Sequence, residues 1–589
     1  MLPASLIPHI ALAGALLGLL LPIGTFIGTN SFLFHLIFFA HLVVHLRAVG
    51  TAIRDAFAVL QKGWLERSIG ACIALPFFMI LICLAFLPIT ARDALIHHIA
   101  VPKWWITAGD IIEIPWHHWS YYPMLIELAS IEFLSWHFES AITLYQVSFL
   151  ILLIGVLSQF AKSTSKTTAI ATLLAITTPI IVRLSSTPYV DLPLVVYGLG
   201  AFHILITNSK MTWHYAIVAG SLLGLCAATK YNGLLFAAVM GLAFLFKYRT
   251  ELTKLFPGLL LSGGVIAFPW YCKNYILTGN PLFPLLPEVF GTTDTLVRAP
   301  EVTKELLQST VPTENGILKI LSLPFQMMLT GQDGNPAFFD GILSPVLLFA
   351  VFSLFSKSHR RVALYGLSIF LAYSYGAIAL SGPRTRYLAP VLGVLVLLAA
   401  LGLEHLLHIL RPRLRQALTL LIVCFQAIWG YSYLYTQVRE RSAIAYFTGE
   451  TSKSDYIQRR VSEALLANAI NIKLSEHSKT YLLYTGNRYA LYDHPVINSG
   501  YYSDRLLLTW ILHSSSPEEI RLHFQSSGIT NVAIHRKRYE SAFKSYLAQG
   551  FLSSSDMSNW NTFVATYLVP QFEVGPYQIW SLKDAKINE

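Results

Sequence analysis

Long apolar runs, separated by short polar segments, repeat along most of the chain. Most runs are close to the ~20 residues that an α-helix needs to cross the hydrocarbon core of a bilayer. They lie at about 4–24, 31–48, 70–90, 141–160, 167–184, 191–208, 212–229, 232–247, 255–271, 341–356, 362–381, 388–410 and 416–434. This pattern predicts an α-helical polytopic membrane protein with about thirteen transmembrane helices.

The C-terminal part of the chain follows a different pattern from about Thr436. Short apolar segments at Tyr481–Tyr484, Asn531–Ile534 and Tyr577–Leu582 are typical of strands, and Pro517–Gln525 has the spacing of an amphipathic helix. No glycine-rich phosphate-binding loop follows any of these strands, so nothing there indicates a nucleotide cofactor. We therefore expect three parts: an extra N-terminal transmembrane hairpin with a cytoplasmic segment (1–69), a transmembrane module with outer loops at 91–140 and 272–340 (70–435), and an exoplasmic soluble α/β domain (436–589).

Composition and charge narrow the class further. Hydrophobic residues make up 54% of the chain and charged residues only 13%, which excludes a soluble protein of this size. The net charge of +10 comes largely from short basic clusters between apolar runs, such as 357–361 and 411–415, as in a positive-inside topology. That topology puts the N-terminus in the cytoplasm and the C-terminal domain on the periplasmic or extracellular side. It also argues against nucleic acid as a partner.

The first outer loop carries the strongest candidate for chemistry. The stretch R-D-A-L-I-H-H-I-A-V-P-K-W-W begins directly after an apolar run, and ionisable groups at such a boundary tend to line sites or pathways. We interpret Asp93 as a catalytic carboxylate. The histidine pairs 97–98 and 117–118 are adjacent, so on a helix they point apart and make poor metal ligands. We expect some of them to hydrogen-bond substrate or backbone, and a metal site remains the alternative.

Further polar residues lie at the outer ends of the predicted spans. Asp191 opens a span, where helix capping alone would explain it, or it joins Asp93 at the mouth of the bundle. Four cations break the positive-inside rule, and they are either snorkelling anchors or an anion site. These cations are Lys230, Lys273, Arg384 and Arg386.

Several of these residues belong to motifs that together resemble a known superfamily. In chain order the motifs are D-A-L-I-H-H-I-A-V-P-K (Asp93–Lys103), S-Y-Y-P-M-L-I-E (Ser120–Glu127), Y-V-D-L-P (Tyr189–Pro193), A-T-K-Y-N-G-L-L (Ala228–Leu235), P-W-Y-C-K-N-Y-I-L-T-G-N-P (Pro269–Pro281) and R-Y-L-A-P (Arg386–Pro390). Their order over about 70–435 resembles the GT-C glycosyltransferases, and the closest likeness is to bacterial members of the family 39 protein O-mannosyltransferase and lipid A aminoarabinose transferase group.

The resemblance implies a GT-C-like fold, a donor sugar carried on a polyprenyl phosphate, and Asp93 as the catalytic acid of the first loop. It also implies that Lys230 and Arg386 lie near the donor phosphate, with Arg384 as a further candidate there. The full set of expected substrate-binding residues is His98, Lys103, Glu127, Asp191, Lys230, Arg384 and Arg386. No cofactor is expected to be required, although a divalent metal is left open. The chain departs from its relatives in two respects. It has His97-His98 where they often have Tyr-His, and two extra spans precede the usual first one.

The expected function is inverting transfer of a hexosyl or pentosyl group to a hydroxyl or amine on a lipid, glycan or protein acceptor. A carboxylate would take the acceptor's proton, and cations would stabilise the departing phosphate. The expected setting is cell-envelope glycan biosynthesis at the exoplasmic face of a bacterial inner membrane. Two alternatives remain: a transporter or flippase of lipid-linked sugars, and a glycan ligase or polymerase that uses the same carriers.

Overall fold

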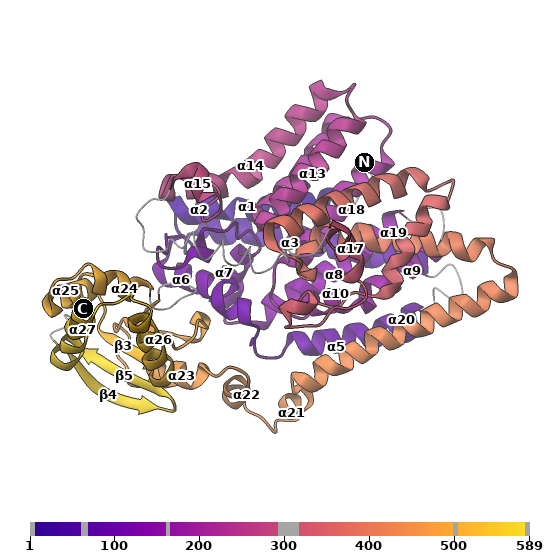
Figure 1. Ribbon diagram of the computed structural model, residues 1–589. Helices are drawn as coiled ribbons and strands as arrows, with labels where there is room; N and C mark the ends of the chain where they lie inside the picture. The colour runs from indigo at the N-terminus through magenta and orange to yellow at the C-terminus, as the bar shows by residue number, and fades with distance from the viewer. Residues whose placement is uncertain (1–5, 61–68, 161–164, 292–316, 499–504, 584–589) are drawn as a thin grey trace.

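The computed structural model describes residues 6–60, 69–160, 165–291, 317–498 and 505–583. Within these ranges a large helical bundle is followed by a small α/β domain at one end of the molecule (Figure 1). Part of the expected cytoplasmic segment, 61–68, and part of the second expected outer loop, 292–316, lie outside the described residues.

The bundle contains all the long apolar helices. Its elements are α1 (Leu6–Gly18), α2 (Leu20–Phe26), α3 (Phe32–Leu60), η1 (Ile69–Ala74), α5 (Leu75–Ala85), η2 (Ala94–His98), α6 (Ala100–Ala108), η3 (His118–Tyr121), α7 (Glu127–Ser135), α8 (Ser140–Phe160), α9 (Ser165–Thr177), α10 (Pro179–Ser185), α11 (Asp191–Thr207), α12 (Trp213–Thr229), α13 (Tyr231–Lys247), α14 (Leu252–Thr278), α15 (Pro287–Phe290), α17 (Ile317–Gln326), η4 (Pro336–Phe338), η5 (Pro345–Phe355), α18 (Arg360–Ser381), η6 (Thr385–Leu388), α19 (Ala389–Ile409) and α20 (Pro412–Glu440).

Every apolar run predicted from the sequence contains at least one of these helices. In the described part of the chain, seven helices are long and apolar enough to cross a membrane on their own, one bent pair passes the same test jointly, and five shorter apolar helices accompany them. The predicted runs thus correspond to helices, and seven of these, or eight with the bent pair, are long and apolar enough to cross a membrane in the described part of the chain.

The bent pair is α9 and α10, which meet at an angle of 66°. The cause is local, because Pro179 opens α10 and a residue before proline is pushed out of the helical region. Thr178 accordingly has φ −75° and ψ 117°, which is extended backbone. The bend makes α10 a short separate helix, and its last turn and the following loop, 186–190, lead directly to Asp191.

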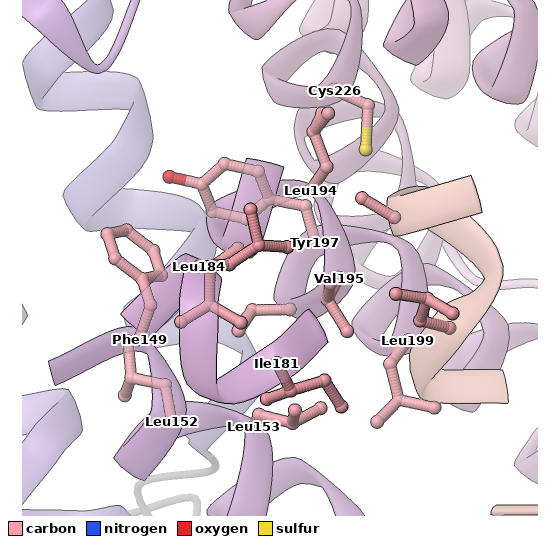
Figure 2. Close-up of a cluster of buried hydrophobic side chains, with 14 of the residues drawn as sticks. Phe149, Leu152, Leu153, Ile181, Leu184, Leu194, Val195, Tyr197, Leu199 and Cys226 are labelled. Atoms are coloured by element: carbon pink, nitrogen blue, oxygen red, sulfur yellow. The ribbon is translucent and has the colours of Figure 1, made fainter. Parts of the chain in front are cut away.

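The centre of the bundle is formed by α11 and α19, whose side chains are buried on nearly every side. Helices of this kind are apolar all round, as expected for a core position. Figure 2 shows the packing around Tyr197 of α11, with Phe149 and Leu153 from α8 and Leu184 from α10. The two helices approach closely at Gly198 of α11 and Pro390 of α19. A Cβ on Gly198 would lie only 2.3 Å from the carbonyl oxygen of Pro390.

The two extra N-terminal spans are part of this bundle rather than an appendage. Helix α3 packs against α1 and α8, and α1 also contacts α12. The Nδ1 atom of His41 lies 2.8 Å from the Ala13 carbonyl oxygen, and Nε2 of His45 lies 2.7 Å from Oγ of Ser148. These contacts satisfy polar groups that would otherwise be costly inside a membrane.

The C-terminal domain contains a five-stranded mixed sheet with the strand order β2-β1-β3-β5-β4. Strand β1 pairs in parallel with β2 and β3, whereas β5 pairs antiparallel with β3 and β4. The elements after the bundle are α21 (Ala443–Phe447), α22 (Lys453–Arg460), α23 (Ala464–Lys473), β1 (Thr480–Leu483), η7 (Tyr489–Leu491), β2 (Val496–Ile497), α24 (Arg505–Leu512), α25 (Pro517–Ser526), β3 (Asn531–His535), α26 (Arg536–Ala548), α27 (Ser554–Tyr567), β4 (Leu568–Val574) and β5 (Tyr577–Leu582). The three predicted strands and the predicted amphipathic helix correspond to β1, β3, β5 and α25.

This domain packs on the first loop of the bundle. Ile96 and Ala100 share a buried apolar cluster with Leu466 and Tyr489 from the domain. A domain held in this way covers the segment that contains Asp93.

Candidate active site

Asp93 and Arg386 form an ion pair although 293 positions separate them in the chain. Asp93 directly precedes η2, a short π-helical turn of a kind often found at functional sites. Arg386 lies in η6, immediately before the central helix α19, and its Nη1 donates to Oδ2 of Asp93. The side chains are 22% and 13% exposed, so the pair is only partly open to solvent.

A second ion pair joins Asp191 and Lys230, with 2.8 Å between Oδ1 and Nζ. Asp191 is the first residue of α11, and Lys230 is the extended residue between α12 and α13. The helical hairpin at Lys230 is tight because Gly233 lies against the preceding helix. A Cβ there would stand 1.8 Å from the Cys226 carbonyl oxygen. The glycine of the A-T-K-Y-N-G-L-L motif therefore allows the tight backbone turn at Lys230.

The ring of Tyr387 connects the two pairs. Its centroid lies 5.6 Å from Nζ of Lys230, 5.5 Å from Cζ of Arg386 and 5.9 Å from Cζ of Arg384. Such distances are within the range of cation–π attraction. The structure thus gathers five of the residues singled out from the sequence around one aromatic ring, and we call this set the Tyr387 group: Asp93, Asp191, Lys230, Arg384 and Arg386.

The histidines of the first loop lie beside this group. The Nδ1 atom of His98 is 2.6 Å from Oε1 of Glu127, and both side chains are buried. The His98 ring also contacts the ring of Tyr189 at 5.8 Å. Hence His98 and Glu127 form a supporting pair next to the Tyr387 group, rather than part of it.

His97 faces the Tyr387 group more directly. Burial and the neighbouring His98 hold the pKa of His97 well below its ordinary value, although Asp93 acts in the opposite direction. Its ring stacks on Trp119 at 5.7 Å, and its buried Nδ1 has no hydrogen-bond partner in the described part of the chain. A neutral imidazole with a spare nitrogen is therefore available beside Asp93. The sequence had left the role of this residue open.

Two predicted cations lie elsewhere. Lys103 donates to the carbonyl oxygens of Ala490 (3.2 Å) and Tyr492 (2.7 Å) and pairs with Asp493 at 2.7 Å, so it ties the first loop to the C-terminal domain. Lys273 donates to the Ser120 carbonyl oxygen at 2.8 Å. The structure therefore places both lysines outside the Tyr387 group.

The electrostatics of Asp93 follow from its surroundings. Burial by itself would raise the pKa of this carboxyl, but the charge of Arg386 and its hydrogen bond to the carboxylate outweigh burial and hold the pKa well below its usual range. Asp93 is therefore ionised at neutral pH. Arg386 has a further donor to offer, because its buried Nε lacks a hydrogen-bond partner among the described residues.

Sequence reasoning missed a cavity of about 280 Å³ next to Asp93, which Arg92, Arg183, Arg441 and Arg460 help to line. Tyr189 also lines it, and the Tyr189 hydroxyl oxygen accepts a hydrogen bond from the backbone N–H of Asp93. One signal could have revealed part of this cavity, since Arg183 stands inside a predicted span, where an ionisable residue is costly.

Metal binding was left open by the histidine-rich loop. In the ranges that the structure describes, no group of three or more His, Cys, Asp or Glu side chains is arranged to hold a metal ion.

The comparison with solved structures decides the fold. ArnT from Cupriavidus metallidurans bound to undecaprenyl phosphate is 13% identical, with a TM-score of 0.51 over 88% of this chain and 98% of that chain. The apo state of the same protein is 12% identical, with a TM-score of 0.54 over 86% of this chain and 96% of that chain. The chain has the GT-C fold.

The GT-C-like fold expected from the ordered motifs is thus confirmed. With its long apolar helices, the chain is an integral membrane protein. A family model described as "Domain of unknown function (DUF8201)" matches residues 3–295, which include the N-terminal hairpin. No curated protein matches the chain.

Proposed function

We propose that this GT-C protein is an inverting glycosyltransferase that moves a hexosyl or pentosyl group from a polyprenyl-phosphate carrier to an acceptor hydroxyl or amine. The observation that carries the proposal is the Tyr387 group, in which three cations lie over one aromatic ring and two of them pair with carboxylates from distant parts of the chain. An ArnT structure with this fold holds undecaprenyl phosphate, which supports a carrier of that kind.

Donor binding begins with the cations. The phosphate of the carrier binds Lys230 and Arg386. It accepts a hydrogen bond from Nε of Arg386, which has no other partner among the described residues. Arg386 is shared between the phosphate and Asp93, so donor binding weakens its hold on the carboxylate. Less neutralisation by Arg386 makes Asp93 a stronger base at the moment when the donor is in place.

The transfer step then balances as a single displacement. Asp93 accepts the proton from the acceptor hydroxyl or amine, and the acceptor atom forms a bond to the anomeric carbon. The bond from that carbon to the phosphate oxygen breaks on the opposite face, and the configuration inverts. The negative charge that develops on the phosphate is stabilised by Lys230 and Arg386, which are already positioned.

We place this reaction on the periplasmic face of a bacterial inner membrane. The basic clusters between spans favour a cytoplasmic N-terminus and an exoplasmic C-terminal domain. The domain contacts the loop that carries Asp93, through Lys103 and Asp493, so the two belong on the same side.

The test is an Asp93→Asn variant in proteoliposomes that contain radiolabelled polyprenyl-phosphate sugars and acceptor extract. An amide cannot accept the proton, so we expect transfer to fall about 100-fold or more, while the variant still binds the donor. The matched control is Asp110→Asn, since Asp110 is an exposed acid of the same loop. Transfer at the parental rate by Asp93→Asn would refute the assignment.

The same assay separates the rival functions that the sequence left open. A transporter or flippase moves the carrier across the bilayer and leaves the label on it, whereas a transferase releases the label from the carrier. A ligase or polymerase also releases label, but into products that grow by whole glycan units. Electrophoresis of the labelled product therefore distinguishes all three.

A further inference from the structure

The arginine-lined cavity next to Asp93 is the feature that the proposed reaction leaves unused. It lies where the end of α5, the loop after α10 and the segment after α20 come together. Among the described residues, its lining includes four arginines and no aspartate or glutamate. A cavity so rich in guanidinium groups is suited to an anion, because arginine binds phosphate and carboxylate through paired hydrogen bonds.

Arg441 gives the strongest evidence that the charge of this cavity is not balanced by the protein itself. Its Nη1 donates to the Ser186 carbonyl oxygen at 2.7 Å, and Nε and Nη2 donate to Oε1 of Gln437 at 3.1 and 2.8 Å. Both partners are neutral. Burial lowers the pKa of Arg441, and the charges of Arg460 and Arg183 act in the same direction. A partly buried cation that has only neutral partners among the described residues is costly unless a ligand supplies the counter-charge.

Two further arginines at the cavity, both exposed, also lack a carboxylate partner among the described residues. Arg460 donates to Oγ1 of Thr90 at 3.4 Å and to the Glu440 carbonyl oxygen, and it lies over the ring of Tyr456. Arg92 is exposed at the rim, and the described residues provide no ion pair for it.

Arg183 differs from these three. It pairs with Asp333 at 3.3 Å and Asp340 at 3.1 Å, so its charge is already compensated. Three arginines without a carboxylate partner in the described ranges, Arg92, Arg441 and Arg460, thus remain at one cavity.

The cavity borders the Tyr387 group through Tyr189. The Tyr189 hydroxyl oxygen accepts a hydrogen bond from the Asp93 backbone N–H, and the Tyr189 ring lies 5.9 Å from Cζ of Arg386. Arg92 precedes Asp93 directly in the chain. Tyr189 therefore lies between the Tyr387 group and the cavity.

We propose that this cavity is a second anion site, which binds a phosphate or carboxylate group of the acceptor and so brings the acceptor's nucleophile to Asp93. The acceptor role rests on the proposed function, whereas anion binding does not. A volume of about 280 Å³ holds a phosphate together with part of the group that bears it. An anchored acceptor gains rate through positioning, as expected for a reaction between two held substrates.

The test measures binding without turnover. Native mass spectrometry of the full chain in detergent compares dioleoyl phosphatidate with dioleoylglycerol, and tryptophan fluorescence compares glucose 6-phosphate with glucose. The variants are Arg441→Gln with Arg460→Gln, and separately Arg92→Gln, whose exposed side chain makes misfolding a weak explanation. The control is Arg439→Gln, since Arg439 is exposed two residues from Arg441 and does not line the cavity.

We expect the phosphorylated probe to bind and the neutral one not to bind. The double variant should weaken phosphate binding about tenfold or more, Arg92→Gln less, and the control not at all. Loss of phosphatidate binding identifies a lipid acceptor group, and loss of glucose 6-phosphate binding identifies a soluble one. Equal affinity in the double variant and the control, or no binding of either phosphorylated probe, would overturn the proposal.

The experiment also separates this proposal from the proposed function. Lys230→Gln alters the Tyr387 group and leaves the cavity intact, so phosphate bound in the cavity should survive it. If Asp93→Asn transfers sugar normally and the arginine variants still lose the anion, only the catalytic assignment fails. If Asp93→Asn is inactive and the arginine variants bind normally, only the acceptor site fails.

Discussion

Replacing Arg386 with glutamine should remove the positive charge that pairs with Asp93 and so destabilise the protein. Removing one partner of a buried ion pair costs roughly 3–5 kcal/mol, because the other charge stays buried and unpaired. Asp93 is 22% exposed and Arg386 13% exposed, so solvent relieves part of that cost. We expect the unfolding free energy at neutral pH to fall by about 2–3 kcal/mol.

The pH dependence gives the sharper signature. Arg386 lowers the pKa of Asp93, so the pair's contribution to stability is present above the ordinary aspartate pKa of about 3.9 and is lost as the pH falls towards the native value. In Arg386→Gln the carboxyl stays buried without that partner, and burial raises its pKa. The stability difference between parent and variant should therefore be largest near neutral pH and shrink as the solution becomes acidic.

The assay follows thermal unfolding by intrinsic fluorescence between about pH 4 and 8, together with the pH profile of kcat/KM for sugar transfer. The acidic limb of that profile should move to higher pH in Arg386→Gln. Arg384→Gln is the matched control, because Arg384 packs on the same Tyr387 ring and does not pair with Asp93. A stability difference that stays constant with pH, or an acidic limb that does not move, would show that Arg386 does not control Asp93.

Two further predictions concern the supports of the site. Gly233→Ala should reduce the melting temperature and the donor affinity, because the new Cβ would meet the Cys226 carbonyl oxygen at 1.8 Å and displace the hairpin. The control is Gly241→Ala, which should change neither quantity, because no described atom lies within 4 Å of a Cβ at Gly241. Lys103→Gln should loosen the C-terminal domain from the first loop through loss of the 2.7 Å contact with Asp493, and so speed trypsin cleavage between bundle and domain. An unchanged cleavage rate would show that apolar packing alone holds the domain.

The helices of this protein could be predicted from the sequence because the signal is local. A run of about 20 apolar residues satisfies its own backbone and needs no partner to be recognised. Even the bend between α9 and α10 has a local cause in Pro179. The strands β1, β3 and β5 were visible for the same reason. Strand β2, of two residues, carries too little pattern to be recognised alone.

The candidate site could be predicted only as a set of residues, and not as a set of pairs. Positive-inside reasoning placed Asp93, Asp191, Lys230 and Arg386 at outer span ends, and the structure brings them together. It could not say that Asp93 meets Arg386 rather than Lys230, because that choice depends on how α11 and α19 pack.

Lys103 shows the limit of motif reasoning. It belongs to the same short motif as Asp93, yet its partner, Asp493, lies 390 positions away in the C-terminal domain. Arg441 and Arg460 were missed for a related reason. They follow the last span, where charged residues are usual at the start of a soluble segment, and only the fold brings them back to Asp93.

Charge balance explains why the two proposed anion sites should behave differently. Within each ion pair, Asp93 with Arg386 and Asp191 with Lys230, the two charges neutralise each other. These four residues can therefore remain partly buried without a ligand. An incoming donor phosphate must therefore compete with carboxylates, and its binding is necessarily coupled to the base strength of Asp93. Arg441 binds only neutral partners, so an anion in the cavity displaces no carboxylate from it. Binding of the acceptor should then position its nucleophile without changing the base strength of Asp93. Only binding of the donor should make Asp93 a stronger base.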